Sequence, residues 1–287
     1  MASISLRAGG NPVPGIEWRA YEAGHCTHPE CATRQGAPFA SIRYPAHAFA
    51  LRHPQQGWIV FDTGYSEHFM DATRHLPERL YRAVTPVHLA AGESLCAQLG
   101  RDGVAAGDIG RVVISHLHGD HVGGLHDFPG AALSCSRAAW EDMRARSRLG
   151  SLKHGLLPRL LPDDFLDRVH WIEDAPRRQL PPALADFGTG HDLLGDGSLL
   201  AIALPGHAAG HYGLLFDDPH GTSTFLVADA AWSSQAIREG VPPPALVTAW
   251  LGDTQAYRDT LQRLHQLNKA APAIRLLPSH CSEWRAR

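Results

Sequence analysis

The sequence lacks any apolar run as long as the roughly 18 residues that a membrane-spanning helix requires. Its first ten residues, MASISLRAGG, also lack the basic start and the apolar stretch of a signal peptide. These two absences predict a cytoplasmic protein that does not act at a membrane.

Cysteine and net charge are low as well. The five cysteines are an odd number scattered along the chain, so a disulfide framework is not expected. The formal net charge is −3 with 26 basic residues, and no basic, glycine-rich arm is present. Because nucleic-acid binding requires a positively charged surface, we expect a small-molecule partner and no nucleic acid.

Hydrophobic residues are plentiful, at 44% of the 287 residues, which is enough for a large folded core. No repeat or linker divides the chain, so a single domain over residues 1–287 is expected. Short apolar runs predict strands at residues 46–52, 58–61, 112–115, 199–204, 224–228 and 274–277. Helices are predicted at residues 137–148 and 253–269, and as an insertion at 66–100 that is broken at Pro77 and Pro86. Strands and helices interspersed in this way indicate an α/β sandwich.

The segment 152–169 is rich in leucine and is interrupted by Pro158 and Pro162. Such a segment fits a lid or a pocket wall that would accommodate an apolar acyl or aryl group. A packed connection between two elements is an equally good interpretation, and the sequence leaves both open.

Histidine is unusually frequent, with 19 copies, which makes metal binding an early hypothesis. The strand predicted at residues 112–115 is followed directly by an H-x-H-x-D-H motif. Side chains two residues apart in an extended segment point the same way, so His116 and His118 can reach one ion together. A turn at Gly119 into a helix would let Asp120 and His121 reach a second ion beside the first.

Three further strands are each followed by a residue that can bind metal. His207 follows the strand at 199–204, Asp229 ends the strand at 224–228, and His280 follows the strand at 274–277. Loops at strand ends are where α/β folds build functional sites. Any one of these residues alone would be read as a surface or helix-capping residue, but the set together with the H-x-H-x-D-H motif predicts a metal centre.

Two histidines and two cysteines also lie close together, at His25, Cys26, His28 and Cys31. Four ligands so near in sequence cannot easily surround one tetrahedral ion. A turn that carries reduced thiols is therefore the preferred interpretation, with a separate metal site as the alternative.

The motifs from about Phe61 to His280 resemble those of the metallo-β-lactamase superfamily. That family shows Asp-Thr-Gly, H-x-H-x-D-H, Pro-Gly-His, a carboxylate after a strand and a late histidine, as this chain does at residues 62–64, 116–121, 205–207, 229 and 280. The resemblance implies an α/β fold, specifically a four-layer αβ/βα sandwich with a dinuclear site at one edge. It also leaves room for a homodimer.

The resemblance further implies which residues bind which ion. The first ion would be held by His116, His118 and His207, the second by Asp120, His121 and His280, and Asp229 would bridge the two. Imidazole and carboxylate ligands suit two zinc ions, with iron, manganese or cobalt as alternatives.

The chemistry implied is hydrolysis by a hydroxide formed between the two metals. Asp120 would shuttle the proton, while Asp62 and His211 would orient the metal ligands. Within the superfamily, the chain most resembles N-acyl homoserine lactonases and methyl parathion hydrolase-like members. This resemblance predicts a lactonase or esterase that acts on a substrate with an apolar tail. Those lactonases carry a tyrosine three residues after the bridging aspartate, where this chain has Trp232, so Trp232 and Tyr212 are the candidates to replace it.

Other members of the superfamily remain alternatives. The Pro-Gly-His-x-x-Gly-His pattern at 205–211 is similar to that of glyoxalase II, a thioester hydrolase. A persulfide dioxygenase with a single iron has the same fold but typically leaves the second site unfilled. A non-catalytic ligand sensor of this fold would be expected to have lost some ligands, which this chain retains.

Overall fold

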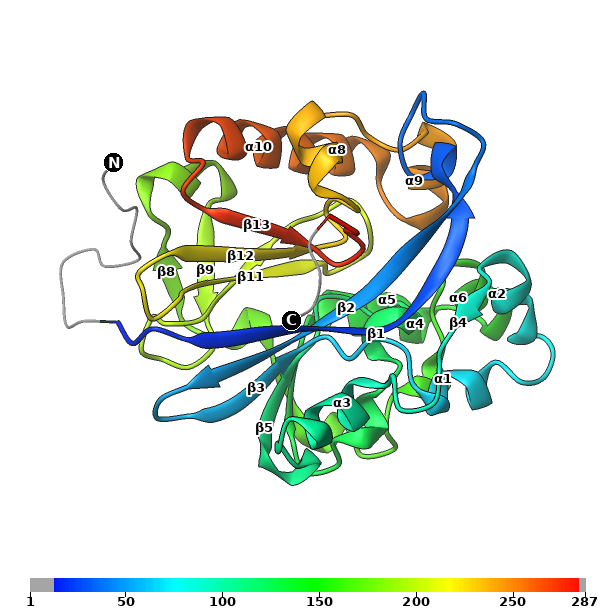
Figure 1. The fold of residues 1–287 in the computed structure, drawn as a ribbon, viewed down its shortest axis with the longest axis horizontal. Coiled ribbons are helices and arrows are strands. Elements are labelled where there is room, and N and C mark those ends of the chain that lie inside the picture. Colours follow the sequence, from blue (N-terminus) through cyan, green and yellow to red (C-terminus); the bar gives the residue numbers. More distant parts are fainter. Residues whose placement is uncertain (1–12, 284–287) are drawn as a thin grey trace.

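A computed structural model describes residues 13–283 of the chain (Figure 1). Residues 1–12, on which the expectation of a cytoplasmic protein partly depends, lie outside the described residues, as do residues 284–287. Within the described range, no helix is both long enough and apolar enough to cross a membrane.

Two sheets form the centre of the molecule. The first has seven strands in the order β4-β1-β2-β3-β5-β6-β7, and the second has six in the order β13-β12-β11-β10-β9-β8. The bounds of the first sheet are β1 Glu17–Pro29, β2 Ser41–His53, β3 Gly57–Phe61, β4 Val87–His88, β5 Ile109–Val113, β6 Ala132–Cys135 and β7 Val169–Trp171. Those of the second are β8 Arg177–Gln179, β9 Thr189–Asp192, β10 Leu200–Ala203, β11 Tyr212–Asp217, β12 Ser223–Ala228 and β13 Arg275–Pro278.

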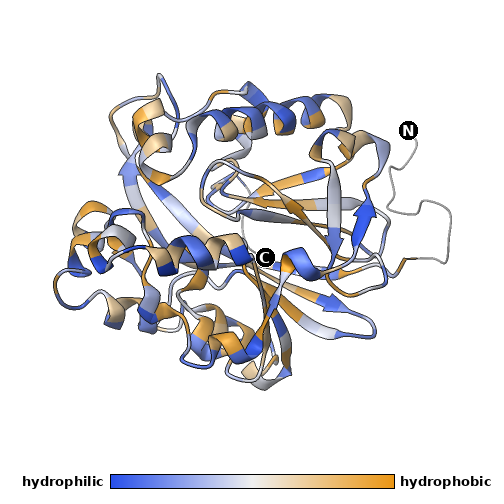
Figure 2. Cartoon of the chain, turned by 180° about the vertical axis from the view of Figure 1, so that it is seen from behind, coloured by the Kyte–Doolittle hydropathy of each residue, from blue (hydrophilic) through white to orange (hydrophobic). Residues whose placement is uncertain are grey.

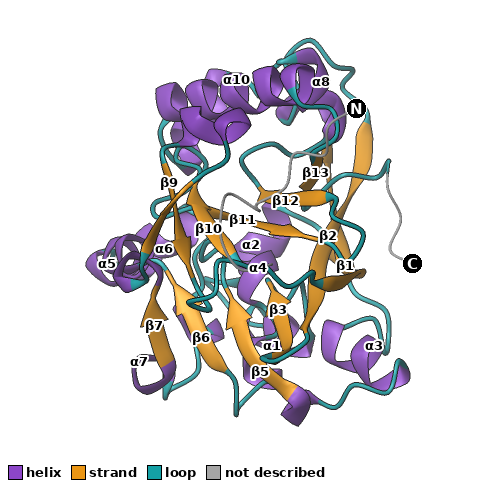
Figure 3. Ribbon diagram, turned by 90° about the vertical axis from the view of Figure 1, so that its left-hand side faces the viewer, coloured by secondary structure: helices purple, strands orange, loops and turns teal. Residues whose placement is uncertain are grey.

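Helices cover the outer faces of both sheets (Figure 3). Their bounds are α1 Glu67–Ala72, α2 Arg79–Val84, α3 Leu95–Arg101, α4 Gly119–Val122, α5 Arg137–Ala145, α6 Arg148–Lys153, α7 Phe165–Arg168, α8 Ser234–Glu239, α9 Ala245–Leu251 and α10 Thr254–Ala270. The longest, α10, begins where Asp253 accepts a hydrogen bond from the backbone N–H of Ala256. It buries Tyr257, Leu261 and Leu264, three residues at helical spacing, against the second sheet.

Three apolar clusters separate four layers. One lies between the sheets and joins Phe49 and Phe61 of the first sheet to Leu214 and Phe216 of the second. The other two lie between each sheet and the helices outside it. Apolar residues are accordingly concentrated in the strands, while α10 carries both polar and apolar residues (Figure 2). The predicted four-layer αβ/βα sandwich is confirmed.

The six predicted strands and the helices at 137–148 and 253–269 are present with shifted ends. The segment 66–100 is helical only in part, because it also contains β4, which pairs with β1. The turn expected at residues 25–31 is wrong for residues 25–29, which belong to β1. That strand pairs with β2 from Glu17 to Pro29, across a bulge between Glu22 and His25.

The segment 152–169 divides into two parts. Leu157, Leu160 and Phe165 are buried in the cluster under the first sheet. Leu152, Lys153 and Gly155, by contrast, line a cavity described below. Most of the segment is thus a packed connection, and only its start contributes a wall.

Candidate metal centre

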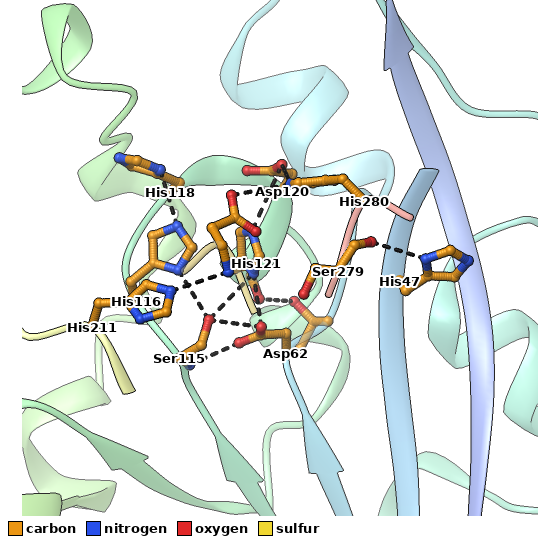
Figure 4. Close-up of polar contacts among 12 residues, drawn as sticks. His47, Asp62, Ser115, His116, His118, Asp120, His121, His211, Ser279 and His280 are labelled. Carbon is orange, nitrogen blue, oxygen red and sulfur yellow. Dashed lines mark hydrogen bonds and ion pairs between the residues drawn. The ribbon is translucent and has the colours of Figure 1, made fainter. Parts of the chain in front are cut away.

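The carboxyl ends of five strands meet at one edge of the sandwich. β3 and β5 run parallel in the first sheet, and β12 and β13 run parallel in the second, with β10 in the same direction as β12. The H-x-H-x-D-H motif follows β5, and the turn predicted at Gly119 begins α4. The residues at or just after the carboxyl ends of these strands include most of the predicted site residues, and the fold brings them together. They are Asp62, His116, His118, Asp120, His121, His207, Asp229 and His280, most of which are drawn in Figure 4.

Three histidine nitrogens converge in the first ligand group. His116 Nε2 and His207 Nε2 each lie 3.0 Å from His118 Nδ1. Zinc–nitrogen distances of about 2.0–2.1 Å in a tetrahedral site place the nitrogens roughly 3.3 Å apart, which is close to this spacing. The three side chains are buried and their nitrogens point at one position, so they can hold one ion.

The second group consists of Asp120, His121 and His280. His280 Nε2 lies 3.3 Å from Asp120 Oδ2, and His121 Nε2 lies 3.8 Å from the same oxygen. These three side chains occupy the side of the site opposite His118, as Figure 4 shows.

Asp229 lies between the two groups. Its Oδ2 is 3.3 Å from His207 Nε2 in the first group and 3.1 Å from His280 Nε2 in the second. Its Oδ1 is 3.4 Å from His121 Nε2. Trp232 Nε1 donates a 3.1 Å hydrogen bond to Oδ2, so the indole holds the carboxylate from the side. A carboxylate in this position can contact both ions.

Hydrogen bonds fix the tautomers of two candidate ligand histidines, His116 and His280. Ser115 donates to Asp62 through both its backbone N–H, at 2.8 Å, and its hydroxyl, at 2.7 Å. The hydroxyl oxygen is therefore left to accept from His116 Nδ1, 3.0 Å away. His280 Nδ1 donates to the carbonyl of Pro45 at 2.7 Å. With Nδ1 protonated, Nε2 of both histidines keeps its lone pair for a metal.

His211 also lies beside the ligands. Its Nε2 accepts a 3.1 Å hydrogen bond from the backbone N–H of Asp229, and its ring centroid is 4.9 Å from that of His116. His211 therefore contacts one candidate ligand, Asp229, and packs against another, His116, without belonging to either ligand group.

Backbone conformations that L-residues rarely adopt occur at the strand ends that supply the site. Asp62 has φ +56° and Ala228 has φ +45°. Strain of this kind persists only where the surroundings hold it, and it is common at functional sites. Gly206, at φ +130°, has no room for a side chain, because a Cβ would lie 2.2 Å from the backbone nitrogen of Tyr257. This close approach to α10 positions His207.

The two candidate ligand groups differ in the pKa values of their histidines. Burial lowers the pKa of His118 to about 4 and lowers the pKa values of His116 and His207 well below their usual range, so all three are neutral. Burial also opposes the charge of His280, but Asp229 and Asp120 outweigh it and raise the pKa of His280 to about 9. Neutral imidazoles suit metal binding directly, whereas an ion at the second group would displace protons.

The residues present fit divalent cations. His121 Nε2 and Asp229 Oδ1 are both buried without a hydrogen-bond partner among the described residues, although they face each other. Buried polar atoms are rarely left unpaired, so a cation that both could bind accounts for them. The donor set of nitrogen and oxygen atoms without thiolate is one that zinc, iron, manganese and cobalt accept.

A cavity of about 730 Å³ opens onto this site. His118, Asp120, Asp229 and His280 form its base. Its apolar wall comes from three separate elements, α2, α6 and α9, through Leu80, Val84, Leu149, Leu152, Leu246, Val247, Trp250 and Leu251. The contributions of α2 and α9 could not be found from the sequence, because neither segment carries a motif.

Trp232 and Tyr212, the two candidates to replace the lactonase tyrosine, lie in different parts of the structure. Trp232 lines the cavity, which is the position required of a residue that contacts the substrate. Tyr212 does not, because it lies on β11 and its ring packs in the cluster between the sheets, 5.9 Å from His191. Tyr65, which the sequence analysis did not single out, lines the cavity.

The residues at 25–31 stay outside both ligand groups. His25 stacks on His88 with ring centroids 4.9 Å apart, and His28 Nε2 lies 3.0 Å from Thr85 Oγ1. Cys26 and His28 line the cavity wall. Among the described residues, no ligand group includes any of the four.

Comparison with known sequences gives one family and several relatives. The profile of the Metallo-beta-lactamase superfamily matches residues 42–280. The chain is 30% identical over 214 residues to the N-acyl homoserine lactonase AttM of Rhizobium johnstonii, covering 73% of each protein. It is 28% identical over 265 residues to the metallo-hydrolase mfmC of Annulohypoxylon moriforme, covering 84% of this chain and 64% of that protein.

Comparison with solved structures shows the same fold. An N-acyl homoserine lactone hydrolase with the product N-hexanoyl-L-homoserine at its catalytic metal center superposes with a TM-score of 0.68 and 19% identity, covering 95% of both chains. A quorum-quenching N-acyl homoserine lactone lactonase superposes with a TM-score of 0.66 and 20% identity, covering 96% of this chain and 95% of the other.

Proposed function

The chain belongs to the metallo-β-lactamase superfamily, and from that premise we propose that it opens a lactone or ester with an apolar tail, using two divalent metal ions, zinc in the first instance. Its relatives are lactonases and metallo-hydrolases, and the chain is a metal-dependent hydrolase. The substrate, the number of ions and the roles of individual residues are the parts that we propose.

One observation carries the proposal: Asp229 lies within 3.3 Å of a histidine from each ligand group, at the base of a cavity with an apolar wall. The ligands of the first ion would be His116, His118 and His207, those of the second Asp120, His121 and His280. Because the second group is complete, two ions are favoured over the single iron of a persulfide dioxygenase.

Bound at these positions, two divalent ions supply an acidified water and a Lewis acid for the substrate carbonyl. Asp120 lies 3.3 Å from His280 and lines the cavity, so its carboxylate can take a proton from the attacking water and return it to the leaving oxygen. Asp62 and Ser115 orient the ligand histidines, and Trp232 holds Asp229. His211 positions the Asp229 backbone.

The residues of the cavity wall indicate which kind of substrate tail the cavity accommodates. Leucine, valine and tryptophan side chains surround a space of about 730 Å³, which is large enough for a medium-length acyl chain or an aryl group. Lys153 lies over the Trp250 ring at 4.9 Å and joins α6 to α9 across the wall. A reactive carbonyl at the base with an apolar tail along this wall suits an acyl lactone or an ester.

The proposal is tested by loading the purified protein with zinc, measuring bound metal, and following acid release. The substrates are N-decanoyl homoserine lactone, an aryl ester, a thioester and a phosphotriester, with Asp120→Asn as the control. We expect two zinc equivalents and hydrolysis of the lactone or the aryl ester, reduced strongly in the variant. Two bound ions without hydrolysis of any lactone or ester would overturn the proposed substrate class.

A further inference from the structure

We infer that His28 and Thr85 together supply one hydrogen-bond donor in the cavity, which binds a carbonyl oxygen of the substrate other than the one that is attacked. The inference rests on the proposed function, since it assigns a contact in the same cavity. It favours an acyl amide between the reactive group and the apolar tail, because an amide supplies such an oxygen and an alkyl chain does not.

The two residues lie where a bound molecule can reach them. Both line the cavity, and both side chains are only partly buried. On β1, Cys26 and His28 belong to the cavity lining, whereas His25 and Thr27 do not. Side chains two residues apart on a strand share a face, so this alternation shows that β1 directs the His28 imidazole toward the cavity.

The backbone holds the pair in place. Thr27 N–H donates to the carbonyl of Pro86 at 3.0 Å, which joins β1 to the segment that contains Thr85. Thr85 N–H donates to the carbonyl of Tyr81 at 2.7 Å, at the end of α2. A donor that is fixed in this way loses little conformational freedom when a ligand binds to it.

The two side chains form one hydrogen bond with each other and retain one donor. His28 Nε2 lies 3.0 Å from Thr85 Oγ1, and neither side chain has another hydrogen-bond partner within residues 13–283. A neutral imidazole has one N–H, and a threonine hydroxyl has one O–H. If Thr85 donates to Nε2, the Nδ1–H of His28 is left over; if Nε2 donates to the hydroxyl, the O–H of Thr85 is left over. One donor therefore stays unused in either tautomer.

The neighbouring hydroxyls of the cavity are already used. Thr33 and Tyr44 also line it. Thr33 Oγ1 donates to the carbonyl of Glu30 at 3.0 Å, so it accepts from the Tyr44 hydroxyl, 2.6 Å away. The His28–Thr85 pair differs from this second pair in retaining a donor for a ligand.

The imidazole is neutral at neutral pH. Burial lowers the pKa of His28 below its ordinary value, an effect that Asp120 opposes and His280 increases. Since Asp120 and His280 lie at the cavity base, His28 is within electrostatic reach of the candidate metal centre.

A retained donor selects among substrates. Water can accept its hydrogen bond when no substrate is bound, but an apolar tail that displaces the water leaves the donor without an acceptor. A carbonyl oxygen at the same position keeps the bond. The pair therefore discriminates against substrates that lack this oxygen.

The test compares two ligands, N-decanoylglycine and tridecanoate, which share a terminal carboxylate and the same number of chain atoms. N-decanoylglycine has an amide carbonyl, and tridecanoate has methylene groups instead. Their affinities for the zinc-loaded protein are measured by calorimetry. The double variant His28→Phe/Thr85→Val removes both donors of the pair. The control His25→Phe/Thr27→Val removes a histidine and a threonine of the same strand that do not line the cavity.

We expect the affinity for N-decanoylglycine relative to tridecanoate to fall about tenfold in the double variant, which corresponds to one lost hydrogen bond. Bound zinc should be unchanged, and the control should match the unmodified protein. This result would support the contact even if no lactone or ester were hydrolysed, an outcome that would overturn only the proposed function.

Three results would overturn the inference: an equal affinity ratio in the double variant and the unmodified protein, a fall of the same size in the control, or no binding of either ligand by the unmodified protein. If the double variant does not fold, His28→Phe and Thr85→Val are measured singly. A fall in either one would support the inference, and a fall in neither would overturn it.

Discussion

Asp62 Oδ2 lies 2.7 Å from His121 Nδ1, and both side chains are buried. The same carboxylate accepts two hydrogen bonds from Ser115, the residue before His116. Asp62 follows β3 and the histidines follow β5, so one carboxylate connects two strand ends and holds one residue of each candidate ligand group, His121 directly and His116 through Ser115. We therefore expect Asp62 to influence metal binding strongly, although it belongs to neither ligand group.

The charge of Asp62 is tested by Asp62→Asn, which keeps the shape of the side chain. We expect zinc affinity to fall about 10- to 100-fold, as for other residues that orient metal ligands. The measurement is competition with a chelator of known affinity. Asp196→Asn is the matched control, because Asp196 bonds His53 at 3.0 Å in an Asp–His pair that does not line the cavity. Equal losses in the two variants would contradict the assignment.

Trp232→Phe tests the indole N–H that bonds Asp229. An aromatic ring is kept, although a phenyl ring is smaller than an indole, so most of the packing against His207, at 5.6 Å between centroids, should survive. We expect kcat to fall about tenfold, the value of one lost hydrogen bond to a charged group, with both zinc ions retained. Trp171→Phe, a change on β7 away from the cavity, is the control. An unchanged kcat would show that the indole does not position the carboxylate.

Trp250→Ala tests the apolar wall. Trp250 is half exposed and lines the cavity from α9. Removing it should raise KM for N-decanoyl homoserine lactone about tenfold and leave the N-butanoyl lactone unchanged, because only the longer tail loses apolar contact. Leu166→Ala, an exposed leucine on α7 outside the cavity, should change neither. Equal effects on both lactones would contradict a tail-binding role.

Stability should depend on pH through His47. Burial lowers the pKa of His47 to about 4, below the value of about 6.5 expected in the unfolded chain. The unfolded state thus binds a proton that the folded state excludes. The contribution is fully present above about pH 6.5 and is lost as the pH falls toward 4, by about 3 kcal/mol in total.

Urea unfolding of His47→Asn between pH 7 and pH 4 provides the measurement. The variant should lose less stability over this interval than the unmodified protein. His75→Gln, at an exposed position, serves as the control and should follow the unmodified protein. A loss in His47→Asn as steep as in the unmodified protein would disprove the assignment to His47.

The sequence predicted the fold and which residues lie together at the candidate site because both depend on local patterns. The H-x-H-x-D-H motif lies in consecutive residues, and His207, Asp229 and His280 each lie at a strand end that apolar runs reveal. The αβ/βα arrangement then followed from the resemblance, and the structure confirms it. Whether each of these residues binds metal stays a prediction.

The remaining elements could not be predicted because their signals are tertiary. β1 contains Gly24, His25 and Pro29 and carries no continuous apolar run, yet pairing with β2 makes it a strand. Tyr212 was a candidate by sequence position alone, and only the packing of β11 shows that it faces the space between the sheets. Tyr65 belongs to no motif, and only the folded structure places it on the cavity wall.

The proposed ligands are divided between the two sheets, with His116–His121 following β5 and His207, Asp229 and His280 following the strands of the second sheet. His118 and His207, whose nitrogens lie 3.0 Å apart, are 89 positions apart in the sequence. An ion bound by both would act as a cross-link between halves of the chain that are otherwise joined by apolar packing and hydrogen bonds such as that from His280 Nδ1 to the Pro45 carbonyl. Unfolding and release of metal would then be a single cooperative event, so that the catalytic centre would exist only in chains whose two halves are correctly assembled.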